Sequence, residues 1–210
     1  MKRILFTPLV VLVAALVAFT TGCGHAEAAS ADGTSATLAT WTAPGSLYCS
    51  LGCTGLAAWA NTDRVPDARL QEALFVLSAY VPELGPVLEQ DARQGVRIVV
   101  GRPEDPRAGA DYDVSQRRIT VRPEEAAGDI GALASLLAHE LVHGTQDHTR
   151  AGHGCRDEIE AYTWQALVWE RLRRSSAYSG LDEMVRAWHQ GSLPQLVASW
   201  PLYRDVCSNQ

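Results

Sequence analysis

The chain has 210 residues, of which 47% are hydrophobic and 20% are charged, a composition typical of a globular protein with an apolar core. Its formal net charge of −6 argues against nucleic acid as a partner, because nucleic-acid-binding surfaces are rich in Lys and Arg. Once a targeting segment is set aside, the length suits one domain, and we expect a monomer.

Residues 1–28 have the features of an export signal. Two basic residues precede an apolar stretch over 4–19, and small residues follow. Gly22-Cys23 resembles a bacterial lipobox, which predicts a lipid anchor at Cys23, whereas the A-x-A pattern at 26–28 would suit ordinary signal cleavage. A retained membrane anchor is disfavoured because the apolar stretch is short for a bilayer span. We therefore expect an extracytoplasmic protein, secreted or anchored as a lipoprotein.

The cysteines support the same compartment. Without Cys23, four cysteines remain, and an even number in an oxidising compartment favours disulfides. Several connectivities are open, and we favour Cys155–Cys207 with Cys49–Cys53 as a local loop. A cysteine zinc site is disfavoured because Cys49 and Cys53 lack a second close pair of Cys or His.

Residues 29–46 are rich in Ala, Ser, Thr and Gly and are expected to form a flexible tether to a domain over 47–210. Asp67 and Asp129 are expected to cap helices, and Gly95 and Gly144 to end them. Apolar periodicity predicts helices over 56–59, 67–80, 83–93, 129–143, 156–174, 180–189 and 194–200, a strand over 96–100 and a hairpin with arms at 112–114 and 118–122. This order predicts an α+β class, mostly helical, with a small sheet before the helix at 129–143.

That helix ends in His139-Glu140-Leu141-Val142-His143, an H-E-x-x-H motif. Residues four apart share a helix face, so His139 and His143 can bind one metal ion. Glu140 is placed to hold and deprotonate a metal-bound water. A motif this short also arises by chance. The predicted amphipathic helix and the strands before it favour a metal site over two incidental surface histidines.

A catalytic zinc normally has three protein ligands and an open position. A downstream histidine pattern, H-E-x-x-H-x-x-G-x-x-H, is excluded because position 146 is Gln and position 149 is Thr. The next helix offers Glu158 and Glu160, which point to different sides, so only one can face the metal. Spacing weakly favours Glu158 and leaves Glu160 open. Glu158 shares a helix face with three further residues: Ala161, Tyr162 and Gln165.

With these residues, the sequence resembles the gluzincin type of zinc metallopeptidase, particularly small single-domain secreted bacterial forms. In several such families the ligand helix reads E-x-x-A followed by Asp or Asn. Glu158-Ile159-Glu160-Ala161 matches this pattern, and Tyr162 stands where Asp or Asn orients a ligand histidine. The resemblance covers the layout of residues 96–175.

The resemblance implies a zincin-like fold and a Zn²⁺ ion bound by His139, His143 and Glu158. It implies hydrolysis of peptide bonds in a peptide or protein substrate, with Glu140 as general base. It also implies that a small Ala161 lets the two helices pack closely, and that the strand at 118–121 offers its edge to an extended peptide.

Other interpretations remain open. A non-catalytic zincin-fold envelope protein that binds a partner is the main alternative, although a pure metal site would not need Glu140. Tyr162, Tyr178 and Tyr203 are candidates for stabilising an oxyanion, and the sequence does not choose among them. His148 and His153 fit polar loop residues better than extra ligands. Cys155 could ligate zinc as a thiolate, but the disulfide is favoured.

Overall fold

The computed structural model describes Trp59 and residues 63–146, 154–172 and 178–207. All of them belong to one compact unit that runs from Ala43 to Gln210. The described part is mostly helical with one small sheet, which confirms the predicted α+β class. The predicted export signal, the predicted tether, the predicted Cys49–Cys53 loop and most of the predicted helix at 56–59 lie outside the described residues.

Helices α2 (Ala68–Tyr80) and α3 (Gly85–Gln94) precede the sheet in the continuous described stretch that begins at residue 63. Helix α2 begins at Asp67, whose carboxylate accepts hydrogen bonds from the Arg69 and Leu70 backbone N–H groups, as predicted. A short 3-10 turn, η2 (Pro82–Leu84), leads into α3. Gly95 ends α3 with a φ of 78°, a left-handed conformation that favours glycine.

The sheet has three strands, β1 (Arg97–Val100), β2 (Ala110–Asp113) and β3 (Arg118–Val121), in the order β1-β3-β2. Strand β3 pairs in parallel with β1 and antiparallel with β2. The predicted strand and hairpin are therefore confirmed, with the first hairpin arm starting earlier than expected. The predicted free edge of the strand at 118–121 is wrong, because β3 is the central strand and both its edges are paired.

The H-E-x-x-H motif lies on α5 (Ile130–Thr145), which follows a short helix, α4 (Pro123–Ala126). Asp129 caps α5 through the Gly131 and Ala132 backbone N–H groups. The prediction that Gly144 ends this helix is wrong, because the helix continues through it. A Cβ at Gly144 would lie 2.3 Å from an Asp91 carboxylate oxygen on α3, so close packing, not helix termination, explains this glycine.

Four helices follow: α6 (Cys155–Leu172), α7 (Ser179–His189), α8 (Leu193–Ser199) and α9 (Arg204–Cys207). The first three match predicted helices, and α9 is additional. The predicted disulfide joins Cys155 at the start of α6 to Cys207 in α9, with an S–S distance of 2.03 Å.

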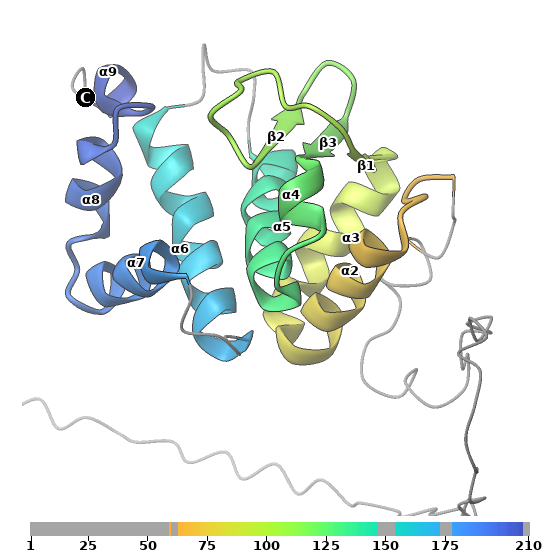
Figure 1. Ribbon diagram of the computed structural model, residues 1–210, viewed down its shortest axis with the longest axis horizontal. Helices are drawn as coiled ribbons and strands as arrows, with labels where there is room; N and C mark the ends of the chain where they lie inside the picture. The colour runs from red at the N-terminus through yellow and green to blue at the C-terminus, as the bar shows by residue number, and fades with distance from the viewer. Residues whose placement is uncertain (1–58, 60–62, 147–153, 173–177, 208–210) are drawn as a thin grey trace, which may run out of the picture. The chain divides into compact units, whose positions relative to one another are not determined.

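The buried side chains form two apolar clusters. One is shared by α2, α3, the sheet and α5, and the other by α6, α7 and α8. Helix α6 lies between α5 and the C-terminal helices (Figure 1) and contributes to both clusters. In the described part of the chain, no helix combines the length and apolar character needed to cross a membrane. The motif helix α5 belongs mainly to the first cluster, and α6 links that cluster to the second.

Candidate metal centre

Helix α5 places both motif histidines inside the protein. His139 and His143 are one helical turn apart and are 4% and 5% exposed. Their neighbours on α5, including Ala138, Leu141 and Val142, are buried too. A helix that is apolar on most of its surface must be covered on several sides, and α2, α3 and α6 cover it here. The imidazoles are therefore fixed in the interior.

Helix α6 brings Glu158 to the same place. Glu158 is 8% exposed and lies in the first turn of α6. Ala161, one turn further along, is fully buried in the cluster that contains the α5 side chains. Its small side chain is compatible with the close packing of the two helices that the resemblance implies.

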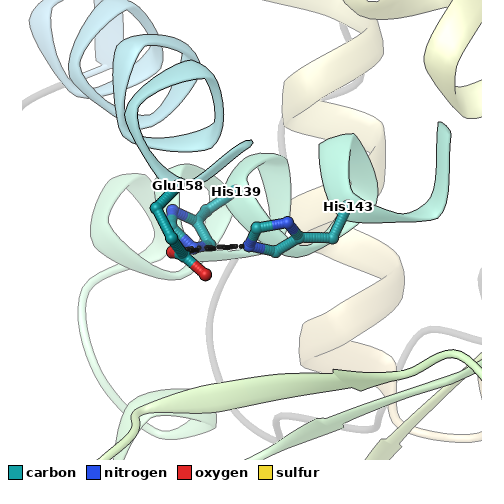
Figure 2. Close-up of side chains that lie close together, drawn as sticks. All are labelled: His139, His143 and Glu158. Carbon is teal, nitrogen blue, oxygen red and sulfur yellow. Dashed lines mark hydrogen bonds and ion pairs between the residues drawn. The ribbon is translucent and has the colours of Figure 1, made fainter. Parts of the chain in front are cut away.

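Three potential ligand atoms converge between α5 and α6 (Figure 2). The Nε2 atoms of His139 and His143 are 3.1 Å apart. A carboxylate oxygen of Glu158, Oε2, lies 3.6 Å from the first and 3.7 Å from the second. A tetrahedral zinc ion with bonds of about 2.0–2.1 Å separates its ligand atoms by about 3.3 Å. The observed separations bracket that value, so these residues fit a metal ion.

The remaining polar atoms of this cluster support the same conclusion. Glu158 Oε2 is buried and has no hydrogen-bond partner, although buried carboxylate oxygens are normally paired. Two imidazoles and one carboxylate are also a donor set that suits zinc. The cluster therefore has the chemistry, as well as the spacing, of a site for a metal ion.

The structure separates the two candidate glutamates. Glu160 is exposed, and its carboxylate accepts a hydrogen bond of 3.4 Å from the Gln146 side-chain amide. Glu158, in contrast, is buried and faces both imidazoles (Figure 2). Of the two glutamates, the geometry therefore favours Glu158 as the third candidate ligand.

Burial and charge act against each other in this cluster. Burial lowers the pKa of His139 to about 4, which keeps the ring neutral at pH 7. Burial also opposes protonation of His143, but its interactions with Glu158 and Glu140 outweigh that effect and raise its pKa to about 9. The same imidazoles hold the pKa of Glu158 well below its usual range despite burial. Without a metal, a proton on His143 therefore offsets the charge of the buried carboxylate.

Glu140 lies beside this cluster. It is 5% exposed, and burial raises the pKa of its carboxyl from 4.5 to about 7. The backbone of Tyr112, in the edge strand β2, lies close enough to that carboxyl to lower its pKa, against the larger effect of burial. A carboxyl that titrates near neutrality is suited to accepting and returning a proton.

A layer of aromatic residues covers the ligands from the C-terminal side. The ring of Tyr162 meets the ring of His139 edge-on, with centroids 4.2 Å apart. The Tyr162 hydroxyl is 2.9 Å from the Tyr203 hydroxyl, and the latter also reaches the Glu158 side chain. The disulfide ties Cys207, one turn beyond Tyr203, to the start of α6. Two of the three predicted tyrosines therefore adjoin the site.

Tyr178 does not join them. Its hydroxyl accepts a hydrogen bond from the Asp129 backbone N–H, at the opposite end of α5 from the motif. His148 and His153 lie outside the described residues. Sequence reasoning missed Gln146, whose side-chain oxygen is 2.7 Å from Nδ1 of His143. Its position three residues after His143, at the C-cap of α5, was the available signal.

Comparisons with protein-family models, with curated proteins and with solved structures find no match for this chain.

Proposed function

We propose that this protein is a zinc-dependent peptidase with a zincin-like fold, in which His139, His143 and Glu158 hold the metal. The single observation that carries the proposal is the convergence of three buried ligand atoms within 4.8 Å of one another next to a buried carboxyl. A bound zinc ion would supply a Lewis acid and lower the pKa of a water molecule.

Glu140 then acts as general base. Its raised pKa, about 7, lets the carboxyl take a proton near neutral pH and pass it to the leaving amine. The influence of the Tyr112 backbone on its pKa places the carboxyl next to β2. Because β2 is an end strand of the described sheet and adjoins Glu140, we place an extended peptide substrate along β2 and not β3.

The proposal also includes the cellular compartment in which the protein acts. A disulfide next to the ligands is consistent with an oxidising environment. Together with the export-signal features of residues 1–28, it supports an extracytoplasmic peptidase, secreted or lipid-anchored at Cys23.

The test is to measure zinc content and peptide hydrolysis in parallel. The purified protein should bind about one zinc per chain and hydrolyse members of a broad peptide library. Glu140→Gln should keep the zinc and lose hydrolysis, because it removes only the base. Glu158→Gln should lose much of the zinc affinity, whereas Glu160→Gln, on the same helix but exposed, should keep both zinc and activity.

Each outcome that departs from these expectations would contradict a different part of the proposal. Zinc binding without hydrolysis across the library would favour a non-catalytic binding protein. A protein that binds no zinc would refute the metal site. Equal losses in Glu158→Gln and Glu160→Gln would contradict the assigned third ligand.

A further inference from the structure

Two buried polar atoms near the ligands have no hydrogen-bond partner: Nδ1 of His139 and Oε1 of Gln165. Gln165 is 6% exposed. Buried polar atoms are seldom left unpaired, and each such atom needs an explanation. Here one atom is the second ring nitrogen of a candidate ligand, and the other is an amide oxygen.

The fold brings the two side chains together. Gln165 lies two turns after Glu158 on α6, so both project from the same side of that helix. The Gln165 side chain already interacts with the His139 imidazole and favours its protonated form, against the larger effect of burial. Because Nε2 of His139 faces His143 and Glu158, Nδ1 is the nitrogen left for Gln165.

The other ligand histidine shows the completed form of such a contact. Nδ1 of His143 is 2.7 Å from Oε1 of Gln146. A metal-bound histidine usually donates its second ring N–H to a nearby acceptor, which fixes the tautomer and the ring orientation. His143 has that acceptor, and His139 needs an equivalent one.

Tyr162 is another side chain from α6 beside His139, and it cannot fill this role. Its ring, not its hydroxyl, meets the imidazole. Its hydroxyl is engaged with the Tyr203 hydroxyl at 2.9 Å. The acceptor for His139 must therefore come from another residue, and Gln165 is the buried amide one turn further along α6.

We propose that Gln165 is the positioning residue for His139, with Oε1 accepting a hydrogen bond from the Nδ1–H group when Nε2 binds the metal. The inference rests on the metal site of the proposed function. Each ligand histidine is then oriented by a neutral glutamine amide. Unlike a carboxylate, an amide fixes the ring without adding negative charge beside the metal.

The experiment compares zinc affinity across variants of the full protein, using a competing chelator. Gln165→Met keeps the size of the side chain but removes the acceptor, and it should weaken zinc binding by about 10- to 100-fold. Gln165→Glu keeps an acceptor oxygen and should restore most of that loss. Gln71→Met is the matched control, because the Gln71 amide donates to the Val65 carbonyl and should leave zinc affinity unchanged.

A second measurement uses the unaltered chain and does not depend on a variant that folds. In the zinc-loaded protein, nuclear magnetic resonance should detect a slowly exchanging Nδ1–H proton on His139. A rapidly exchanging proton, or one that is unchanged in Gln165→Met, would overturn the inference. So would equal zinc affinities in Gln165→Met and the wild type, or equal losses in Gln165→Met and Gln165→Glu. Failure of the wild type to bind zinc would overturn the proposed function as well.

Discussion

Asp91 on α3 provides the sharpest test of how α5 is held. Its carboxyl is completely buried against Gly144, and neither oxygen has a hydrogen-bond partner. Burial raises the pKa of Asp91 from 3.8 to about 8. Tyr112 on β2 is close enough for its own pKa, raised mainly by burial, to be raised further by the Asp91 charge. The carboxyl is therefore protonated in the folded protein at neutral pH.

The sign of the effect on stability follows from proton binding. In the unfolded chain Asp91 loses its proton near pH 4, whereas in the folded chain it keeps the proton until about pH 8. Between these values the unfolded state binds fewer protons, so the free energy of unfolding falls as pH rises. At about 1.4 kcal/mol per pKa unit, the loss reaches roughly 4 kcal/mol at pH 7. Asp91→Asn should therefore match the wild type near pH 4 and exceed it by roughly 4 kcal/mol at pH 7.

The assay is urea unfolding at several pH values with a chelator present, so that metal binding does not contribute. The difference between Asp91→Asn and the wild type isolates Asp91 from the other groups that titrate. Glu89→Gln is the control, because Glu89 lies on the same helix in a surface ion pair with Arg93. If Asp91→Asn is less stable than the wild type by the same amount at every pH, the conclusion that Asp91 is protonated and unpaired in the folded protein is refuted.

Three further predictions concern the surroundings of the site. Gly144→Ala places a Cβ 2.3 Å from an Asp91 oxygen and should cost about 1–3 kcal/mol. In an Asp91→Ala background the same change should become stabilising, because alanine favours helix over glycine by about 1 kcal/mol. A change in the free energy of unfolding with the same sign in both backgrounds would contradict the contact between position 144 and Asp91. Cys207→Ser should lower the free energy of unfolding by about 4 kcal/mol, because the Cys155–Cys207 disulfide spans 52 positions. The difference from the wild type should vanish in reductant. Asp129→Ala should cost about 0.5–2 kcal/mol through loss of the α5 cap, and Asp129→Asn should recover most of it in the same unfolding assay.

Local signals predicted the helices well. The caps at Asp67 and Asp129 use a side chain that bonds to its own helix start, so neighbouring residues contain the information. The ligand pair likewise follows from a spacing of four on one helix. Glu158 was favoured by the face that it shares with Ala161 on the next helix. Contacts within one or two elements were therefore accessible from the sequence.

Contacts between elements that are far apart in the chain could not be predicted from the sequence. Gly144 has the local signature of a helix end, and only the carboxyl of Asp91, far back in the chain, gives it another explanation. Strand β3 became central because β1 pairs with it in parallel, and strand order is not encoded in the alternation of one strand. Tyr203 reaches the candidate ligands from the turn just before α9, and α9 has too few residues to give a periodic pattern.

The cover formed by Tyr203 and the disulfide has a consequence for biosynthesis. A chain made from its N-terminus releases all three ligands before Tyr203 and Cys207 appear. The ligands can therefore gather through the pairing of α5 and α6, a contact between neighbours in sequence of the kind that forms rapidly. Oxidation of Cys155 and Cys207 is slower, taking seconds to hours depending on the oxidant. Until that bond forms, Tyr203 is not tied to the start of α6 through Cys207, and the three candidate ligands lack this part of their cover.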